Sequence, residues 1–247
     1  MTRSEKNFVT LAKLLLTTLA VCLNCTASAA PPATVHETYD EVTLKRFETL
    51  QADNPILSQD DPYAYYADKP AELSIPETMV CAIRFTDAAK THYHLQTYPD
   101  ANSARADGAH VTHKGLCGTC STLKDLAVYL RKPDLTAPVR RCGIMSGIKS
   151  LAMSCLKDIG FTDACAETWY YNAKNTARQC FTTCMRSWIA GEASNKPDGS
   201  LNNCLECDEI KSGPVFKRAA GRTRRNSGIV SSIGRGSGEF HPLAHDY

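Results

Sequence analysis

The residues best suited to chemistry in this chain are two cysteines, Cys117 and Cys120, spaced as Cys-Gly-Thr-Cys. Residues 109–113 before them alternate like a strand, and the apolar residues after them recur at helical spacing over 123–130. Thr122 stands where it would cap that helix. A cysteine at a helix start has its thiolate stabilised by free backbone N–H groups and by the helix dipole. The position therefore favours a reactive Cys120.

Three interpretations of the pair stay open. In the first, both sulfurs are structural and each is bridged elsewhere, for example to Cys142 or Cys155. In the second, the pair is a redox dithiol, because Cys-Gly-x-Cys at a strand-to-helix junction resembles the thioredoxin-like motif. In the third, Cys120 is a nucleophile and Cys117 is structural or resolving.

The segment from Lys114 to Cys120 also resembles the start of the catalytic helix in the papain family. In that family the second cysteine is the nucleophile and the first is disulfide-bonded, which the resemblance would carry to Cys120 and Cys117. Lys114 stands where the family has its oxyanion glutamine, and Ser121 where it has a tryptophan. The resemblance is confined to this segment, so we do not assign the family.

Four histidines precede the motif, at positions 92, 94, 110 and 113. His92 and His94 are two residues apart on a predicted strand and therefore share a face, a spacing that suits metal ligands or acid–base groups but also two solvent-facing side chains. If the strands over 91–98 and 109–113 are neighbours in an antiparallel sheet, His94 or His113 would reach Cys120 as its base. We predict no metal ion and no cofactor for this protein.

A second cysteine cluster lies toward the end of the chain. Cys180 and Cys184 are four apart and share one face of a predicted helix, and Cys204 and Cys207 follow on a short helix over 202–210. Antiparallel packing of the two elements would pair Cys184 with Cys204 and Cys180 with Cys207. A four-thiolate zinc site has similar spacing, but two disulfides suit an exported protein better.

The N-terminus indicates export. Basic residues, an apolar run over 14–23 and the Ala27-Ser28-Ala29 site form a signal peptide over 1–29. Its removal balances the formal charge of +2, which argues against a nucleic-acid partner. Ten cysteines remain, as in disulfide-bonded proteins of the periplasm or the medium. No later stretch is apolar enough to span a membrane.

The elements predict an α+β fold, a small antiparallel sheet followed by a disulfide-stabilised helical region. We expect strands over 78–85, 91–98 and 109–113, a polar hairpin loop over 99–108, and helices over 37–51, 138–159, 163–172 and 176–190. One cysteine-rich domain would cover 30–210. A basic, Gly/Ser-rich segment would follow over 211–247, with Arg222, Arg224 and Arg225 as candidates for an anionic ligand.

Two classes of function follow from these patterns. The first is an exported, non-enzymatic binding or interaction module of unknown ligand. The second is a thiol-dependent enzyme, for acyl transfer, hydrolysis or thiol–disulfide exchange, that uses Cys120, Cys117 and His113 or His94. We favour the first, because each cysteine has a structural explanation.

Overall fold

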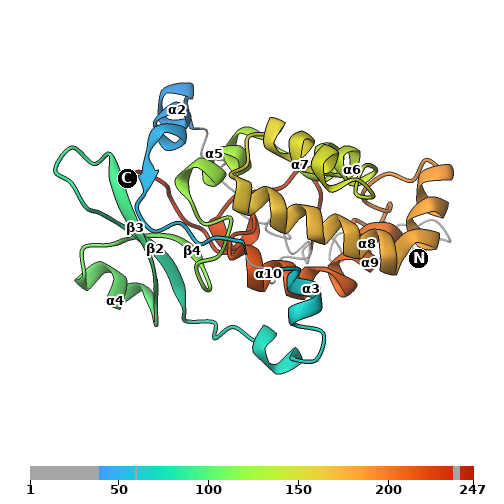
Figure 1. Cartoon of the computed structure of the whole chain (residues 1–247), viewed down its shortest axis with the longest axis horizontal. Helices are drawn as coiled ribbons and strands as arrows, with labels where there is room; N and C mark the ends of the chain where they lie inside the picture. The colour runs from blue at the N-terminus through green and yellow to red at the C-terminus, as the bar shows by residue number, and fades with distance from the viewer. Residues whose placement is uncertain (1–38, 59, 236–239) are drawn as a thin grey trace, which may run out of the picture. The chain divides into compact units, whose positions relative to one another are not determined.

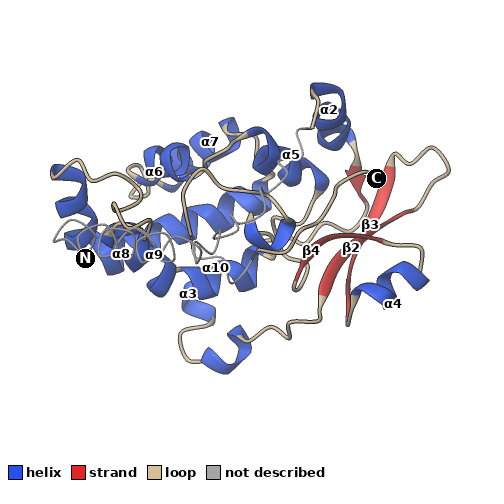
Figure 2. Cartoon of the chain, turned by 180° about the vertical axis from the view of Figure 1, so that it is seen from behind, coloured by secondary structure: helices blue, strands red, loops and turns tan. Residues whose placement is uncertain are grey.

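The computed structural model describes residues 39–58, 60–235 and 240–247. They belong to a single compact unit, shown in Figure 1. The predicted signal peptide lies outside the described residues. In Figure 2 the strands gather at one end of this unit and most helices at the other, which confirms the α+β class.

The sheet has the strand order β1-β3-β2-β4. Its strands are β1 (Gln51–Ala52), β2 (Val80–Phe85), β3 (His92–Tyr98) and β4 (His110–Lys114). β2 pairs antiparallel with both β3 and β4, but β1 pairs parallel with β3. The sheet is therefore mixed. The predicted small antiparallel sheet is confirmed in β2, β3 and β4, and the two-residue β1, which follows α2 directly, adds a parallel edge that was not predicted.

The polar stretch after β3 is a helix and not a hairpin loop. Asp100 accepts a hydrogen bond from the backbone N–H of Ser103 and caps α4 (Ala101–Ala106). The extra helix lets the chain cross over, so β4 pairs with β2. β2 consequently separates the strand that carries His94 from the strand that carries His113.

The helices differ from the predicted ones mainly in where they break. The chain forms, in order, α2 (Glu41–Thr49), α3 (Pro62–Tyr65), the 3₁₀ turn η1 (Pro70–Leu73), α5 (Leu123–Arg131), α6 (Thr136–Gly143), α7 (Lys149–Asp158), α8 (Asp163–Ile189), α9 (Asn203–Lys211), α10 (Gly213–Ala220) and η2 (Arg225–Ser227). The helix predicted over 138–159 is two, α6 and α7, since turns over 144–148 interrupt it.

The two helices predicted over 163–172 and 176–190 are one, the 27-residue α8. The break expected between residues 172 and 176 does not occur, and the side chains of Asn172 and Asn175 there are buried. Asn175 donates to the hydroxyl of Ser212, and Asn172 accepts from the hydroxyl of Tyr63. These amides therefore bond to other elements and leave the helix intact. No helix of the described residues is long and apolar enough to cross a membrane.

α8 organises the helical region. It runs between α6 and α7 on one side and α9 and α10 on the other (Figure 1). α5 packs on α2 beside the sheet. One hydrophobic core joins both regions and includes Phe47, Tyr93, Leu126, Leu156 and Phe216.

Five disulfides link these elements: Cys81–Cys117, Cys120–Cys165, Cys142–Cys155, Cys180–Cys207 and Cys184–Cys204. The two predicted pairings between α8 and α9 are confirmed. The partners suggested for Cys117 and Cys120 were wrong, because Cys142 and Cys155 bond each other. Each of the ten cysteines in the described part of the chain is bonded, and the molecule is a disulfide-stabilised domain.

Candidate functional site

The loop from Gly115 to Thr122 carries the Cys-x-x-Cys motif between β4 and α5. It pairs along the end of α10: the N–H of Thr119 donates to the carbonyl of Ala219 at 3.0 Å, and that of Cys120 to Ala220 at 2.9 Å. The approach is close enough that a Cβ on Gly118 would lie 2.4 Å from the carbonyl oxygen of Ala219. Only glycine fits at this position.

The two motif cysteines bond in different directions. Cys117 is bridged to Cys81 on β2, and Cys120 to Cys165 in the first turn of α8. Cys120 and Cys165 have no exposed surface. The motif thus fastens the sheet to the helical region. A nucleophilic Cys120 or a resolving Cys117 would require reduction of these bridges, and their catalytic roles stay predictions.

His113 lies beneath the same loop and is fully buried. Its Nδ1 lies 2.9 Å from the carbonyl of Lys114 and its Nε2 lies 2.8 Å from the hydroxyl of Ser121. Since a carbonyl only accepts, Nδ1 donates to Lys114 and Nε2 accepts from Ser121. Burial lowers the pKa of His113 well below its usual range. The ring is neutral, and it bonds Ser121 rather than the sulfur of Cys120.

Ser121 has a second role that the sequence did not indicate. Its hydroxyl oxygen accepts a hydrogen bond from the N–H of Gly118 at 2.8 Å, while it donates to His113. A serine in contact with a neutral histidine has the composition of a nucleophile and its base. Both side chains have no exposed surface, and the pair bonds the loop to β4.

Arg222 is buried at the centre of this network. Its guanidinium donates to the carbonyls of Cys120, Thr112 and Ser121, each at 3.1 Å, and to the hydroxyl of Ser227 at 3.2 Å. The prediction that Arg222 serves an anionic ligand was wrong. A run of basic residues is usually exposed to solvent, but the N–H donors of Arg222 bond to groups inside the protein.

The two other candidate arginines are also engaged. Arg224 is half-buried and donates to the carbonyl of Val230 at 3.3 Å, and Arg225 pairs with Glu209 at 3.4 Å. Burial lowers the pKa of Arg224 to about 10. The described residues of the basic segment therefore contact the rest of the chain through these arginines.

His245 completes the buried network. Its Nε2 donates to the carbonyl of Ser227 at 2.8 Å, and its Nδ1 accepts from the hydroxyl of Tyr247. Burial, with the charge of Arg222, lowers the pKa of His245 to about 4. A histidine this far from the motif gave no sequence signal.

His92 and His94 share one face of β3, as predicted, and that face is exposed. Asp53 lies between them, with Oδ1 2.8 Å from Nδ1 of His92 and Oδ2 3.6 Å from Nε2 of His94. A hydrogen bond from Thr86, helped by His92, lowers the pKa of Asp53. No set of three or more His, Cys, Asp or Glu side chains in the described ranges is placed to hold a metal ion.

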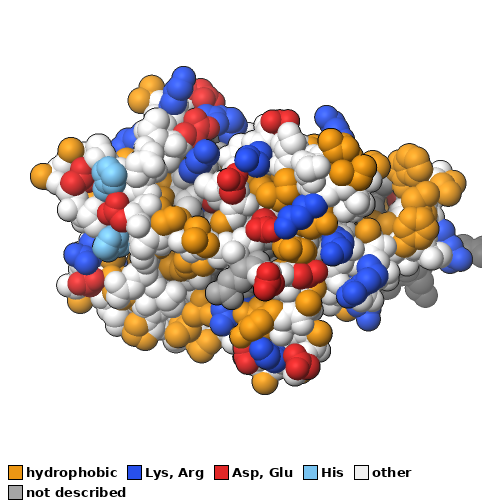
Figure 3. Space-filling model, viewed as in Figure 1, with side chains coloured by type: hydrophobic (Ala, Val, Ile, Leu, Met, Phe, Trp, Pro, Cys, Tyr) orange, Lys and Arg blue, Asp and Glu red, His pale blue; other side chains and the backbone are white. Residues whose placement is uncertain are grey.

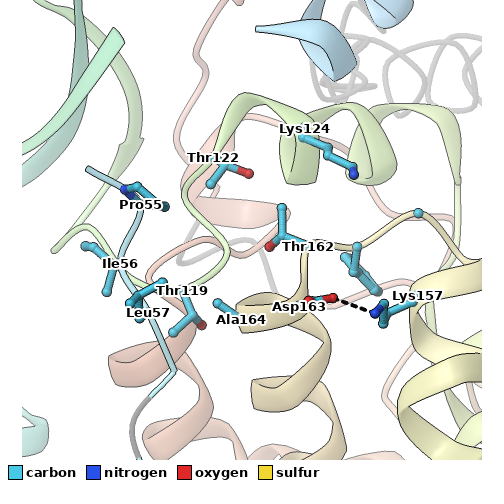
Figure 4. A pocket seen from close by; sticks show the side chains of 12 residues that line it. Pro55, Ile56, Leu57, Thr119, Thr122, Lys124, Lys157, Thr162, Asp163 and Ala164 are labelled. Carbon is cyan, nitrogen blue, oxygen red and sulfur yellow. Dashed lines mark ion pairs between the residues drawn. The ribbon is translucent and has the colours of Figure 1, made fainter. Parts of the chain in front are cut away.

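A cavity of about 510 Å³ lies beside the motif loop, and Figure 4 shows the side chains that line it. Its walls are Pro55–Leu57, Thr119 and Thr122 of the loop, and the start of α8, where Asp163 pairs with Lys157 at 2.9 Å. The threonine hydroxyls bond within the protein, Thr119 to Thr168 and Thr122 to Asp125. The hydroxyls of both loop threonines in the cavity wall are therefore engaged within the protein.

Comparison with known families gives one result. Residues 139–242 match a family described as "Family of unknown function (DUF8771)". The match covers less than half of the chain, and takes in most of α6 through α10 and the segment with Arg222, but neither the sheet nor the Cys-x-x-Cys motif. No curated protein and no solved structure matches the chain. The similarity thus assigns no activity.

Proposed function

We propose that this chain is an exported, non-enzymatic binding module whose disulfides hold a rigid recognition surface. The observation that carries the proposal is the bonding of all ten cysteines in the described residues. A thiol enzyme needs a free or labile thiolate that a substrate can reach. Cys120 is bonded and has no exposed surface.

The other polar groups near the motif support the same proposal. A catalytic base must reach the proton that it takes from a substrate. Both ring nitrogens of His113 are used by Lys114 and Ser121, and the donors of Arg222 are used by backbone carbonyls and Ser227. These groups stabilise the loop, and the exposed surface is left for recognition.

Export rests on two further observations. The Ala27-Ser28-Ala29 site follows a basic and then apolar N-terminus. Five disulfides in one domain are typical of proteins that fold in an oxidising compartment. N-terminal sequencing of the secreted or periplasmic protein should begin near Ala30, and a retained Met1 would contradict export.

The alternative is a thiol enzyme that uses Cys120 once its bridge is reduced. Alkylation of the native protein at neutral pH separates the two classes. We expect no labelled cysteine before unfolding and reduction, and labels on all ten cysteines of the mature chain after both. Selective labelling of Cys120 in the untreated protein would favour the enzyme and would overturn our proposal.

A further inference from the structure

The last turns of α8 are joined to α9 by two disulfides on one face. Cys180 and Cys184, one turn apart, are bridged to Cys207 and Cys204 of α9. On the other side, α6 reaches α8 near Ala173, where a Cβ on Gly143 would lie 3.2 Å from the Cβ of Ala173. Beyond that point, the described residues leave the side of α8 that carries Phe181, Trp188 and Ile189 exposed.

This exposed side is apolar. Phe181, Met185, Trp188 and Ile189 recur at i, i+4, i+7 and i+8 and therefore share one face of α8. Phe181 is 63% exposed, Trp188 69% and Ile189 77%. Large apolar side chains exposed together mark an interaction surface.

The turn between α6 and α7 adds Ile144 and Ile148, which are 80% and 58% exposed. Figure 3 shows hydrophobic side chains gathered over α6 and over the end of α8 on the same side of the molecule, with Lys and Arg beside them. We call this surface the basic-apolar face. It consists of Ile144, Ile148, Phe181, Met185, Trp188 and Ile189 together with Arg140, Arg141, Arg178 and Arg186.

The unpaired charge near these residues is basic. Residues 136–157 and 168–191 contain seven basic and no acidic side chains, of which Lys149, Lys157 and Lys174 pair with Glu167, Asp163 and Asp61 from neighbouring segments. Arg140, Arg141, Arg178 and Arg186 are exposed, and none forms an ion pair with a carboxylate of the described residues. The face therefore complements a negatively charged, partly apolar partner.

We propose that the basic-apolar face docks on a bilayer surface that carries anionic headgroups. This rests on the proposed function as a non-catalytic binding module and names its partner. Protruding Trp, Phe and Ile beside Arg is the composition with which interfacial helices enter the headgroup region, and the Arg fork binds phosphate oxygens. An acidic protein is the competing partner, but these side chains protrude rather than line a groove.

Vesicle binding tests the proposal. The intact mature protein is mixed with vesicles of equal parts phosphatidylglycerol and phosphatidylcholine, or of phosphatidylcholine alone, and the bound fraction is measured by co-sedimentation. We expect binding to the anionic vesicles that weakens as salt is raised, since salt screens exposed charges. Trp188 emission should shift to the blue on binding, and Trp188→Phe should remove the shift, because the other tryptophan, Trp169, is packed between Phe161 and Phe216.

One pair of substitutions and its control pair test the contribution of the arginines of the basic-apolar face. Each Arg near an anionic surface changes the partition coefficient by roughly fivefold, so Arg178→Gln with Arg186→Gln should lower it roughly 25-fold. The matched control is Arg84→Gln with Arg105→Gln, which removes the same charge beside the sheet. The control pair should bind as the parent does.

A second set tests the apolar part. Trp188→Ser with Ile189→Ser should lower the partition coefficient more than tenfold, since each side chain loses its burial in the interface. The control is Val42→Ser with Leu57→Ser, two equally exposed apolar residues outside the face. Near-ultraviolet circular dichroism and the melting temperature establish that each variant is folded.

Absence of binding to anionic vesicles would overturn the proposal, and so would equal binding of the face variants and their controls. Binding of the face to polyglutamate with no response to vesicles would assign it to an acidic protein and would also overturn it. Thiol labelling separates this failure from failure of the proposed function: an unlabelled protein that ignores vesicles loses only the membrane assignment. Labelling of Cys120 in the native protein would instead contradict the proposed function as a non-enzymatic binding module.

Discussion

Removal of the bridge between Cys120 and Cys165 should cost the domain about 4 kcal/mol of its free energy of unfolding. The bridge closes a span of 45 residues. The second bridge nested inside it, between Cys142 and Cys155, shortens the path to 22 residues before that bridge and 10 after it. The shortened path is the sum of these two parts, about 32 residues. Closing a loop of about 45 or about 32 residues gives about 4 kcal/mol in either case, because the dependence on length is logarithmic.

The variant is Cys120→Ala with Cys165→Ala, since both sulfurs are buried in the apolar core and serine would bury unpaired hydroxyls. The matched control is Cys142→Ala with Cys155→Ala. Its span of 13 residues predicts a loss of about 3 kcal/mol.

Urea unfolding under non-reducing conditions, followed by tryptophan fluorescence and extrapolated linearly to water, measures both losses. A domain has roughly 5–15 kcal/mol of stability in total, so the larger loss should be plain. A loss below about 1 kcal/mol for the Cys120 pair would refute our reasoning, because removal of a native disulfide typically costs about 2–5 kcal/mol.

Three further predictions concern the network under the motif. Gly118→Ala should destabilise the fold by about 3 kcal/mol, because its Cβ would collide with the backbone at Ala219; an unchanged melting temperature would contradict this contact. Arg222→Met should cost roughly 3–5 kcal/mol, since it leaves buried carbonyls without donors, and denaturant unfolding measures it. The lowered pKa values of His113 and His245 mean that the unfolded chain binds more protons below the usual histidine pKa of 6.5. Stability is therefore complete above about pH 6.5 and falls toward pH 4, and His245→Gln should flatten that slope in unfolding measured across this range.

Local patterns predicted local structure well. Thr122 caps α5 and accepts a hydrogen bond from the N–H of Asp125, as its spacing indicated. The α8–α9 bridges followed from cysteines one turn apart on a helix, because a helix fixes which side chains share a face. His92 and His94 share an exposed face because a strand repeats every two residues.

Features that join distant segments could not be predicted. The partner of Cys120 lies 45 residues away and that of Cys117 lies 36 residues away, and neither spacing carries a signal. The sheet order depends on α4, which turned a supposed hairpin into a crossover and placed β2 between His94 and His113.

The sequence by itself determined the α+β class, the cap of α5, the α8–α9 bridges and the shared face of the two β3 histidines, because each depends on residues close together in the chain or on a repeat. The tertiary structure decided the rest. It buried the guanidinium of Arg222, although this residue lies in a basic run. The guanidinium donates to the carbonyls of three residues in the β4–α5 segment. The tertiary structure also bonded the reactive-looking Cys120 to α8. Burial is a property of what packs against a residue, and the packing partners here come from segments about a hundred residues apart.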